Sequence, residues 1–142
     1  MSHEGKFKKV GKSGKKMYGH RKLLVCGYPE REQRELLSLL RENGLSDLPV
    51  IFVTSGDLQR TLKEVLDSGD RHDEGEVSGM KRAVIMSGFT QKELHALMTA
   101  YRRSELPVQL WATLTPVSEN WSVADLLDEL AAEAEAIKKQ RK

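Results

Sequence analysis

The chain has 142 residues, of which 39% are hydrophobic and 31% are charged, and its formal net charge is +2. This composition fits one soluble globular domain and excludes a membrane-spanning helix, because no window approaches the roughly 20 apolar residues that a span needs. Cys26 is the single cysteine, which excludes an internal disulfide and a cysteine-based zinc cage. A lone thiol fits a reducing compartment and no apolar stretch follows the N-terminal lysines, so we expect a cytoplasmic protein.

The positive charge is concentrated at the N-terminus. Residues 1–22 contain eight Lys and Arg against one Glu, a net charge of +7, which leaves 15 basic against 20 acidic residues, or −5, for the remainder. A segment this basic, with several glycines and few apolar residues, cannot bury enough surface to order itself. We therefore expect residues 1–21 to be a basic disordered tail.

The first half of the body reads as strand, helix, strand, helix. Leu23–Cys26 is a short apolar run that ends at Gly27 and is typical of a strand buried on both faces. A helix is predicted from Pro29 to Gly44, with proline at its start and glycine as its left-handed stop. Val50–Thr54 predicts a second strand. Asp57 can then cap a second helix, which carries apolar residues on one face.

The second half follows the same plan after a polar, glycine-containing linker. Ala83–Met86 predicts the third strand, and Thr90 can cap a third helix. Val108–Thr113 predicts the fourth strand. Ser122, with Asp125 three residues later, is typical of the start of the last helix.

The two halves resemble each other at a spacing of 61 positions. Leu23-Leu24-Val25-Cys26-Gly27-Tyr28 corresponds to Val84-Ile85-Met86-Ser87-Gly88-Phe89, and Leu48-Pro49-Val50 corresponds to Leu106-Pro107-Val108. Strands joined through helices favour parallel pairing with helices on both faces. We therefore expect an α/β fold, a three-layer sandwich with a four-stranded, mostly parallel sheet built from two βαβα repeats. The expected limits are repeat 1 at about 22–68, a linker at 69–80 and repeat 2 at about 81–138, within a single domain of residues 22–142.

If the repeats pack through their first strands, the strand order is 2-1-3-4. In a parallel sheet of this order, the carboxyl ends of the strands form one edge, with a crevice near Gly27 and Gly88. The linking loop from Thr115 to Trp121 is expected to have no counterpart in the first repeat.

Residues 82–137 resemble the bacterial family catalogued as domain of unknown function 3783. The resemblance rests on Ser87-Gly88-Phe89-Thr90, on Leu110-Trp111-Ala112-Thr113-Leu114-Thr115-Pro116 and on Asn120-Trp121. It covers the second half of the chain alone. The family implies no activity, so no catalytic residue is carried over from it.

The candidate ligand-binding residues follow the expected strands, where small hydroxyl groups, glycine amides and aromatic rings could surround a modest ligand or peptide. The same residue types also satisfy turn backbones and anchor helix starts, which is the competing interpretation. The candidates are Gly27, Tyr28, Thr54, Ser55, Gly88, Phe89, Thr113, Thr115, Asn120 and Trp121.

Cys26 stands between a strand and a helix, where a thiolate can be stabilised by the helix dipole. Ser87 occupies the equivalent position in the second repeat, which favours a small structural residue over a nucleophile. The four histidines are scattered, with His95 beside the apolar stripe of its helix, and they form no metal ligand set. No expected strand ends in an acidic residue. We therefore expect no catalytic residues, no metal and no cofactor.

The sequence thus favours a noncatalytic binding or regulatory module that uses its strand-end loops to hold a protein or a small ligand. Two alternatives remain open. One is a small enzyme that uses Cys26 or a pocket shared between subunits. The other is weak, nonspecific association of the basic tail with nucleic acid. No membrane association is expected. The ligand, the reactivity of Cys26, the oligomeric state and the pathway are left open.

Overall fold

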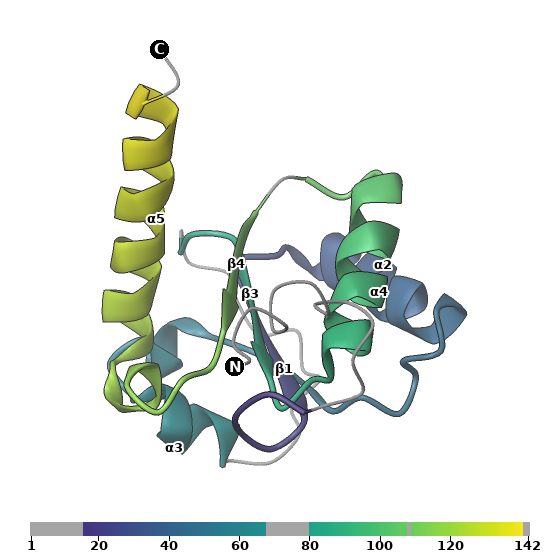
Figure 1. The fold of residues 1–142 in the computed structure, drawn as a ribbon, viewed down its shortest axis with the longest axis horizontal. Helices are drawn as coiled ribbons and strands as arrows, with labels where there is room; N and C mark the ends of the chain where they lie inside the picture. Colours follow the sequence, from purple (N-terminus) through teal and green to yellow (C-terminus); the bar gives the residue numbers. More distant parts are fainter. Residues whose placement is uncertain (1–15, 68–79, 108, 141–142) are drawn as a thin grey trace, which may run out of the picture.

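The computed structural model describes residues 16–67, 80–107 and 109–140, which form four strands, four α-helices and two short 3-10 turns (Figure 1). In chain order the elements are β1 (Lys22–Cys26), α2 (Glu30–Glu42), β2 (Val50–Phe52), η1 (Ser55–Asp57), α3 (Leu62–Leu66), β3 (Ala83–Ser87), α4 (Gln91–Arg103), β4 (Leu110–Thr113), η2 (Ser118–Asn120) and α5 (Val123–Gln140). The four predicted strands and the mixed α/β class are confirmed. The expected tail falls largely on residues 1–15 and the expected linker on residues 68–79, which lie outside the described residues.

The second helix begins later than its sequence suggested. Asp57 does not cap it but ends the turn η1, where its carboxylate accepts a hydrogen bond from the Thr54 amide at 3.0 Å. The cap of α3 is Thr61, whose hydroxyl accepts from the Glu64 amide at 3.1 Å. A threonine followed three residues later by an acidic residue occurs at both places, so spacing alone does not decide between them. The helix forms at the second because it buries Leu62 there.

The sheet is mixed, so the expectation of a mostly parallel sheet is wrong. The strand order β2-β1-β3-β4 agrees with the 2-1-3-4 order. β1 pairs with β2 and β3 with β4 in parallel, but β1 and β3 are antiparallel. A helical crossover favours parallel pairing between the two strands it joins, and it places no such constraint on β1 and β3, which are not consecutive.

The antiparallel pairing of the central strands is centred on Leu24 and Ile85, which lie opposite each other and are 61 positions apart. Lys22 faces Ser87 at one end of this ladder, and Cys26 faces Ala83 at the other. The carboxyl ends of β1 and β3 therefore point to opposite edges of the sheet. The expected crevice between Gly27 and Gly88 does not form, because these glycines follow the opposite ends of two antiparallel strands.

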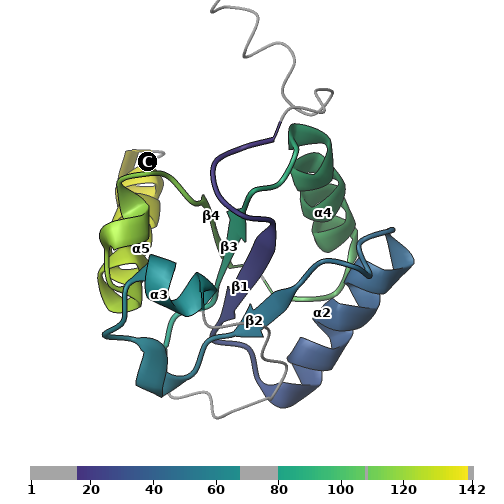
Figure 2. The same cartoon turned by 90° about the horizontal axis from the view of Figure 1, so that it is seen from below.

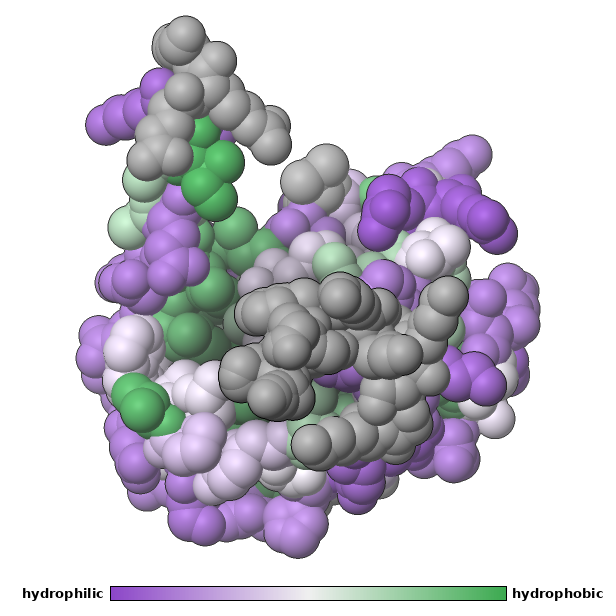
Figure 3. Space-filling view, in the orientation of Figure 1, coloured by the Kyte–Doolittle hydropathy of each residue, from purple (hydrophilic) through white to green (hydrophobic). Residues whose placement is uncertain are grey.

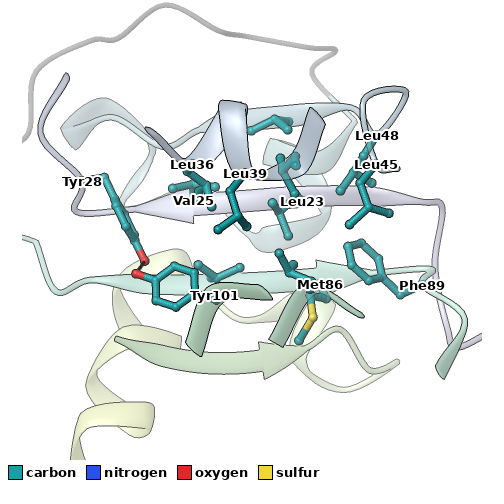
Figure 4. Packing of buried hydrophobic residues seen from close by; sticks show 14 of the residues in the cluster. Leu23, Val25, Tyr28, Leu36, Leu39, Leu45, Leu48, Met86, Phe89 and Tyr101 are labelled. Atoms are coloured by element: carbon teal, nitrogen blue, oxygen red, sulfur yellow. Dashed lines mark hydrogen bonds between the residues drawn. The ribbon is translucent and has the colours of Figure 1, made fainter. Parts of the chain in front are cut away.

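Helices cover both faces of the sheet. Figure 2 shows α2 and α4 on one face and α3 and α5 on the other. Side chains alternate between the two faces along each central strand, as the pleat requires. Leu23 and Val25 pack in the cluster under α2 and α4, which Figure 4 shows, whereas Leu24 and Cys26 pack under α3 and α5. Both faces of β1 are thus shielded from solvent, which explains its continuous apolar sequence.

Residues 16–21, just before β1, lie against the segment that follows β3. The Met17 amide donates to the Phe89 carbonyl at 2.8 Å, and the Gly88 amide donates to the Tyr18 carbonyl at 2.9 Å. Arg21 forms an ion pair with Glu93 at 2.9 Å. These contacts attach the last part of the basic segment to the start of α4.

Candidate functional site

The candidate residues divide between two opposite edges of the sheet. Gly27, Tyr28, Thr54 and Ser55 follow β1 and β2 at one edge, whereas Gly88, Phe89, Thr115, Asn120 and Trp121 follow β3 and β4. Because β1 and β3 are antiparallel, the structure does not bring these two sets together into one site. Each edge therefore has to be considered separately.

The two glycines have a structural role. Gly27 has a φ of +81°, and a Cβ there would lie 2.7 Å from the Lys81 carbonyl oxygen. Gly88 has a φ of +68°, and a Cβ there would lie 2.6 Å from the Arg21 amide nitrogen. The chain just before β3 thus passes close over Gly27, which follows β1. The chain just before β1 passes close over Gly88, which follows β3. Glycine is required for both the left-handed backbone and the close approach.

The two aromatic residues after these glycines are core residues. Phe89 is fully buried, and Tyr28 is 1% exposed. The Tyr28 hydroxyl lies 2.6 Å from that of Tyr101, which donates to the Pro107 carbonyl at 2.6 Å. Figure 4 shows these rings meeting at their hydroxyl ends between α2 and α4. Burial and the hydrogen bond to Tyr101 raise the pKa of Tyr28, so it stays a neutral phenol that links the two helices.

Arg82 and Glu32 complete the polar surroundings of Tyr28. They form an ion pair with each other, and the Arg82 guanidinium lies 5.3 Å from the centre of the Tyr28 ring. This is cation–π distance. Gln33 is also buried there and donates to the Tyr28 carbonyl at 2.8 Å. These contacts hold the start of α2 against the chain that enters β3.

The threonines at the strand ends close equivalent turns. At the edge formed by β1 and β2, Asp57 accepts hydrogen bonds from the amide and the hydroxyl of Thr54 at 3.0 and 3.2 Å. At the other edge, Ser118 accepts from the amide and the hydroxyl of Thr115 at 3.0 and 3.1 Å. The two threonines are 61 positions apart. The loop after β4 therefore has a counterpart after β2, contrary to the expectation from sequence.

The other members of the two loops are also held by backbone contacts. Ser55 begins η1, and its carbonyl accepts from the Leu58 amide. Asn120 donates from Nδ2 to the Pro116 carbonyl at 3.4 Å. The Trp121 carbonyl accepts from the Leu62 amide at 3.0 Å. Most of the candidate residues thus serve the turns and helix starts, as the competing interpretation predicted.

A pocket does open at the edge formed by the carboxyl end of β3, and we call it the strand-end pocket. Its volume is about 540 Å³. Four separate segments surround it: the chain before β1, the helix α3, the end of β3 and the loop after β4. Its lining residues are Tyr18, Gly19, His20, Lys22, Lys63, Leu66, Asp67, Ser87, Leu114 and Glu119.

The floor of the strand-end pocket is mainly apolar, and its polar groups form hydrogen bonds within the protein. Leu66 and Leu114 are buried, and Ser87 is 1% exposed with its hydroxyl donating to the His20 carbonyl at 2.6 Å. The Lys22 ammonium donates to the Leu66 carbonyl at the last turn of α3. Cations are favourable at this end of a helix dipole. These contacts fix the shape of the floor without a ligand.

The rim of the pocket carries charges of both signs. Lys63 lies 3.7 Å from Asp67, and both side chains are largely exposed. The Tyr18 phenol is hydrogen-bonded to Glu119, and this contact raises the pKa of Tyr18. His20 adds an exposed imidazole. The rim can therefore bind a cationic and an anionic group at the same time.

Sequence reasoning missed most of this pocket. In the sequence, His20 and Lys22 belong to the basic segment, and Lys63 and Asp67 are ordinary charges on a short helix. The signals that the sequence did give were the strand-end positions of Ser87 and Leu114 and the loop that contains Glu119. The rest depends on which segments the antiparallel pairing of β1 and β3 brings together.

Cys26 lies at the opposite edge and is fully buried, as the comparison with Ser87 predicted. Burial, and secondarily the charge of Asp57, raise its pKa to about 12. A nucleophilic or metal-binding cysteine needs a stabilised thiolate. The environment of Cys26 does the reverse, which argues against its use in catalysis.

Asp57, which the sequence suggested as a helix cap, is an acidic residue at this same edge. It is 3% exposed and is paired with Arg60 at 3.2 Å in addition to its bonds with Thr54. The spacing of Thr54 and Asp57 is typical of such a cap. Its hydrogen bonds close the turn, so its role there is structural.

A second groove lies on the outer side of α2 and α4 and has a volume of about 580 Å³. Exposed side chains line it, including Lys92, His95 and Arg103. His95 is a surface residue, as expected. All the lining residues come from these two helices and from the residue that follows each of them, so the groove is a furrow between neighbouring helices rather than a pocket closed by several segments.

Within the described residues, no group of three or more His, Cys, Asp or Glu side chains is arranged to hold a metal ion. No helix in the same part of the chain is both long enough and apolar enough to cross a membrane.

Comparison with known proteins finds a family model that matches part of the chain and that carries no activity. No curated protein and no solved structure matches the chain. One segment of the chain does match a family model. It extends from Arg82, next to Tyr28, to Ile137 on α5, and so contains β3, α4, β4, η2 and most of α5. Residues 82–137 match the family model of DUF3783, a domain of unknown function, which confirms the resemblance seen in the sequence.

Proposed function

We propose that the protein is a noncatalytic binding module whose ligand site is the strand-end pocket. The observation that carries this proposal is the pocket itself, with its apolar floor and its rim of mixed charge. Its volume falls within the range of small-molecule sites, roughly 300–1,000 Å³. The loop after β4, which the sequence singled out, contributes one wall through Glu119.

The ligand class follows from the rim. A purely anionic ligand would meet Asp67 and Glu119, and a purely cationic ligand would meet Lys63, so each would face a like charge. A small zwitterion, such as a free amino acid or a dipeptide, can place each of its charges beside the opposite one. We therefore propose this class of ligand.

The relation between the two halves supports a site at one edge only. We infer that residues 22–68 and 81–138 are two copies of one βαβα unit in a three-layer domain of residues 22–142. At the edge without this pocket, Cys26 stands where the other edge has Ser87, and Leu58 stands where it has Glu119. Ala124 stands where it has Lys63, so these two rim charges are absent from the edge without this pocket, although Asp67 has a charged counterpart in Asp128.

Titration calorimetry with the twenty protein amino acids and glycylglycine tests the proposal. We expect at least one to bind with a dissociation constant near the millimolar range or tighter. Lys63→Glu and Glu119→Lys reverse an exposed and a half-buried rim charge, and each should weaken that binding at least about tenfold. Lys92→Glu, on the outer groove, is the matched control and should leave it unchanged. No binding by any probe, or equal weakening by the control, contradicts the proposal.

The alternative of an enzyme that uses Cys26 is not favoured, because its thiol is buried with a raised pKa. Association of the basic tail with nucleic acid involves mainly residues 1–15, which lie outside the described residues. That alternative stays a separate hypothesis, and loss of binding at about 0.2 M salt is its expected signature.

A further inference from the structure

The last helix is much longer than the strand that precedes it. α5 has 18 residues and β4 has four, which correspond to lengths of about 27 and 13 Å. Figure 1 shows the second half of α5 continuing past the sheet. We call residues 128–140 the projecting half of α5.

The apolar stripe of α5 continues onto the projecting half but loses its cover there. In the first turns, Val123 and Leu126 are buried against the sheet. Further along the same face, Leu130 is partly buried and Ile137 is 52% exposed. Figure 3 shows hydrophobic side chains along the inner side of α5 beyond the body. A helical segment of this length gains most of its stability from packing, so an uncovered stripe calls for a partner.

The charges of α5 indicate what that partner is. Within α5, residues 125–135 contain five acidic residues and no basic one, whereas its last turn contains Lys138 and Lys139 and no acidic residue. A second copy of the helix running antiparallel places each basic end beside the acidic stretch of the other. It also opposes the two helix dipoles, which is favourable, whereas a parallel pair would put like charges together.

We propose that the projecting half of α5 pairs antiparallel with the same segment of a second copy, so that the protein is a symmetric homodimer. The pairing buries Leu130, Ala134 and Ile137 against their counterparts. Ala134 lies near the two-fold axis, where its small side chain lets the helices approach closely. The body blocks the first half of the stripe, so only the projecting halves overlap, and the strand-end pocket is not part of this interface.

Sedimentation velocity of the full chain over a range of concentrations tests the association. We expect a concentration-dependent dimer, and Ile137→Glu should raise its dissociation constant at least about tenfold. Val117→Glu is the matched control, since Val117 is also an exposed apolar residue, at 67%, but lies in the loop after β4. Circular dichroism verifies that both variants stay folded. A monomer at all concentrations means that another partner covers the stripe and overturns the proposal, as does equal weakening by the control.

Disulfide cross-linking tests the orientation. Ala131 and Lys138 are seven residues apart, hence on one side of the helix, and lie on either side of Ala134. In a mixture of Ala131→Cys and Lys138→Cys chains, antiparallel pairing predicts a cross-link that joins the two different variants. Cross-links that form chiefly between identical variants would show the helices to be parallel and would overturn the proposal. Cys26 is buried and does not compete.

Discussion

Thr61 and Ser122 lie opposite each other in an antiparallel bridge at the starts of α3 and α5. The Leu62 amide donates to the Trp121 carbonyl, and the Val123 amide donates to the Arg60 carbonyl, at 3.0 and 2.9 Å. The two donors, Leu62 and Val123, are 61 positions apart, and so are the two acceptors, Arg60 and Trp121. The two helices on this face therefore begin at a shared contact.

Loss of either cap should destabilise the protein by a similar amount. The Thr61 and Ser122 hydroxyls each accept from a helix amide, at 3.1 Å in both cases. Thr61→Ala and Ser122→Ala should each lower the free energy of unfolding by about 1 kcal/mol. Urea denaturation measures this, and Thr61→Ser, which keeps the acceptor, should restore most of the loss. An unchanged midpoint in both alanine variants would contradict the assigned caps.

Substitution of Gly27 or Gly88, where two parts of the chain cross closely, should lower the free energy of unfolding much more than substitution of a glycine in open space. Gly27→Ala and Gly88→Ala introduce a Cβ into backbone contact and force a left-handed conformation, so we expect losses of about 3 kcal/mol or more. Gly44 has a φ of +78°, but no atom lies within 4 Å of the position that a Cβ would take, which makes Gly44→Ala the control. It should cost only about 1–2 kcal/mol in denaturation measurements. Equal costs at all three sites would contradict the close crossings.

The tyrosine pair should respond unequally to removal of its hydroxyl groups. Tyr101 joins the Tyr28 hydroxyl to the Pro107 carbonyl, so Tyr101→Phe leaves two polar groups without this partner. We expect it to lower the free energy of unfolding by about 2–3 kcal/mol. Tyr28→Phe leaves the bond to Pro107 intact and should cost about 1 kcal/mol. The reverse order in urea denaturation would show that the donor directions are wrong.

The buried thiol should make stability depend on pH in the alkaline range. The pKa of Cys26 is about 12 in the folded protein against 9.0 for the unperturbed group. The thiol therefore favours the folded state below pH 9, and this contribution is lost as the pH rises toward 12, because only the unfolded thiol ionises there. Unfolding measured from pH 8 to 10.5 should show a steeper loss for the wild type than for Cys26→Ala.

Alkylation gives an independent check of the same thiol. In the native state Cys26 should react with a thiol reagent only at the rate of unfolding, since it is fully buried. Rapid native reaction, or parallel stability curves for the wild type and Cys26→Ala, would contradict the account of this residue.

Local patterns in the sequence identified the elements, but the long-range pairing decided where they meet. The runs around Leu24 and Ile85 are apolar on both faces in either orientation, so nothing local distinguishes a parallel from an antiparallel pair. The antiparallel pairing of β1 and β3 places Gly27 and Gly88 at opposite edges of the sheet, so the strand-end pocket forms instead of a common crevice. The spacing of Thr54 and Asp57 indicated a cap but did not distinguish a turn from a helix start, and the contribution of His20 and Lys22 to a pocket depended on tertiary contact.

The glycine amide resonances measure the central claim most directly, since glycines mark both edges of the sheet. Spectra of the ¹⁵N-labelled chain would be recorded with each amino acid and with glycylglycine at about 10 mM, well above a millimolar dissociation constant. If the strand-end pocket binds a small zwitterion, at least one probe should shift the Gly19 and Gly88 amides. It should leave in place that of Gly27, at the opposite edge, and that of Gly44, which follows α2 and does not line the pocket. If no probe moves Gly19 and Gly88, or if the glycines of both edges shift equally, the pocket is not the ligand site.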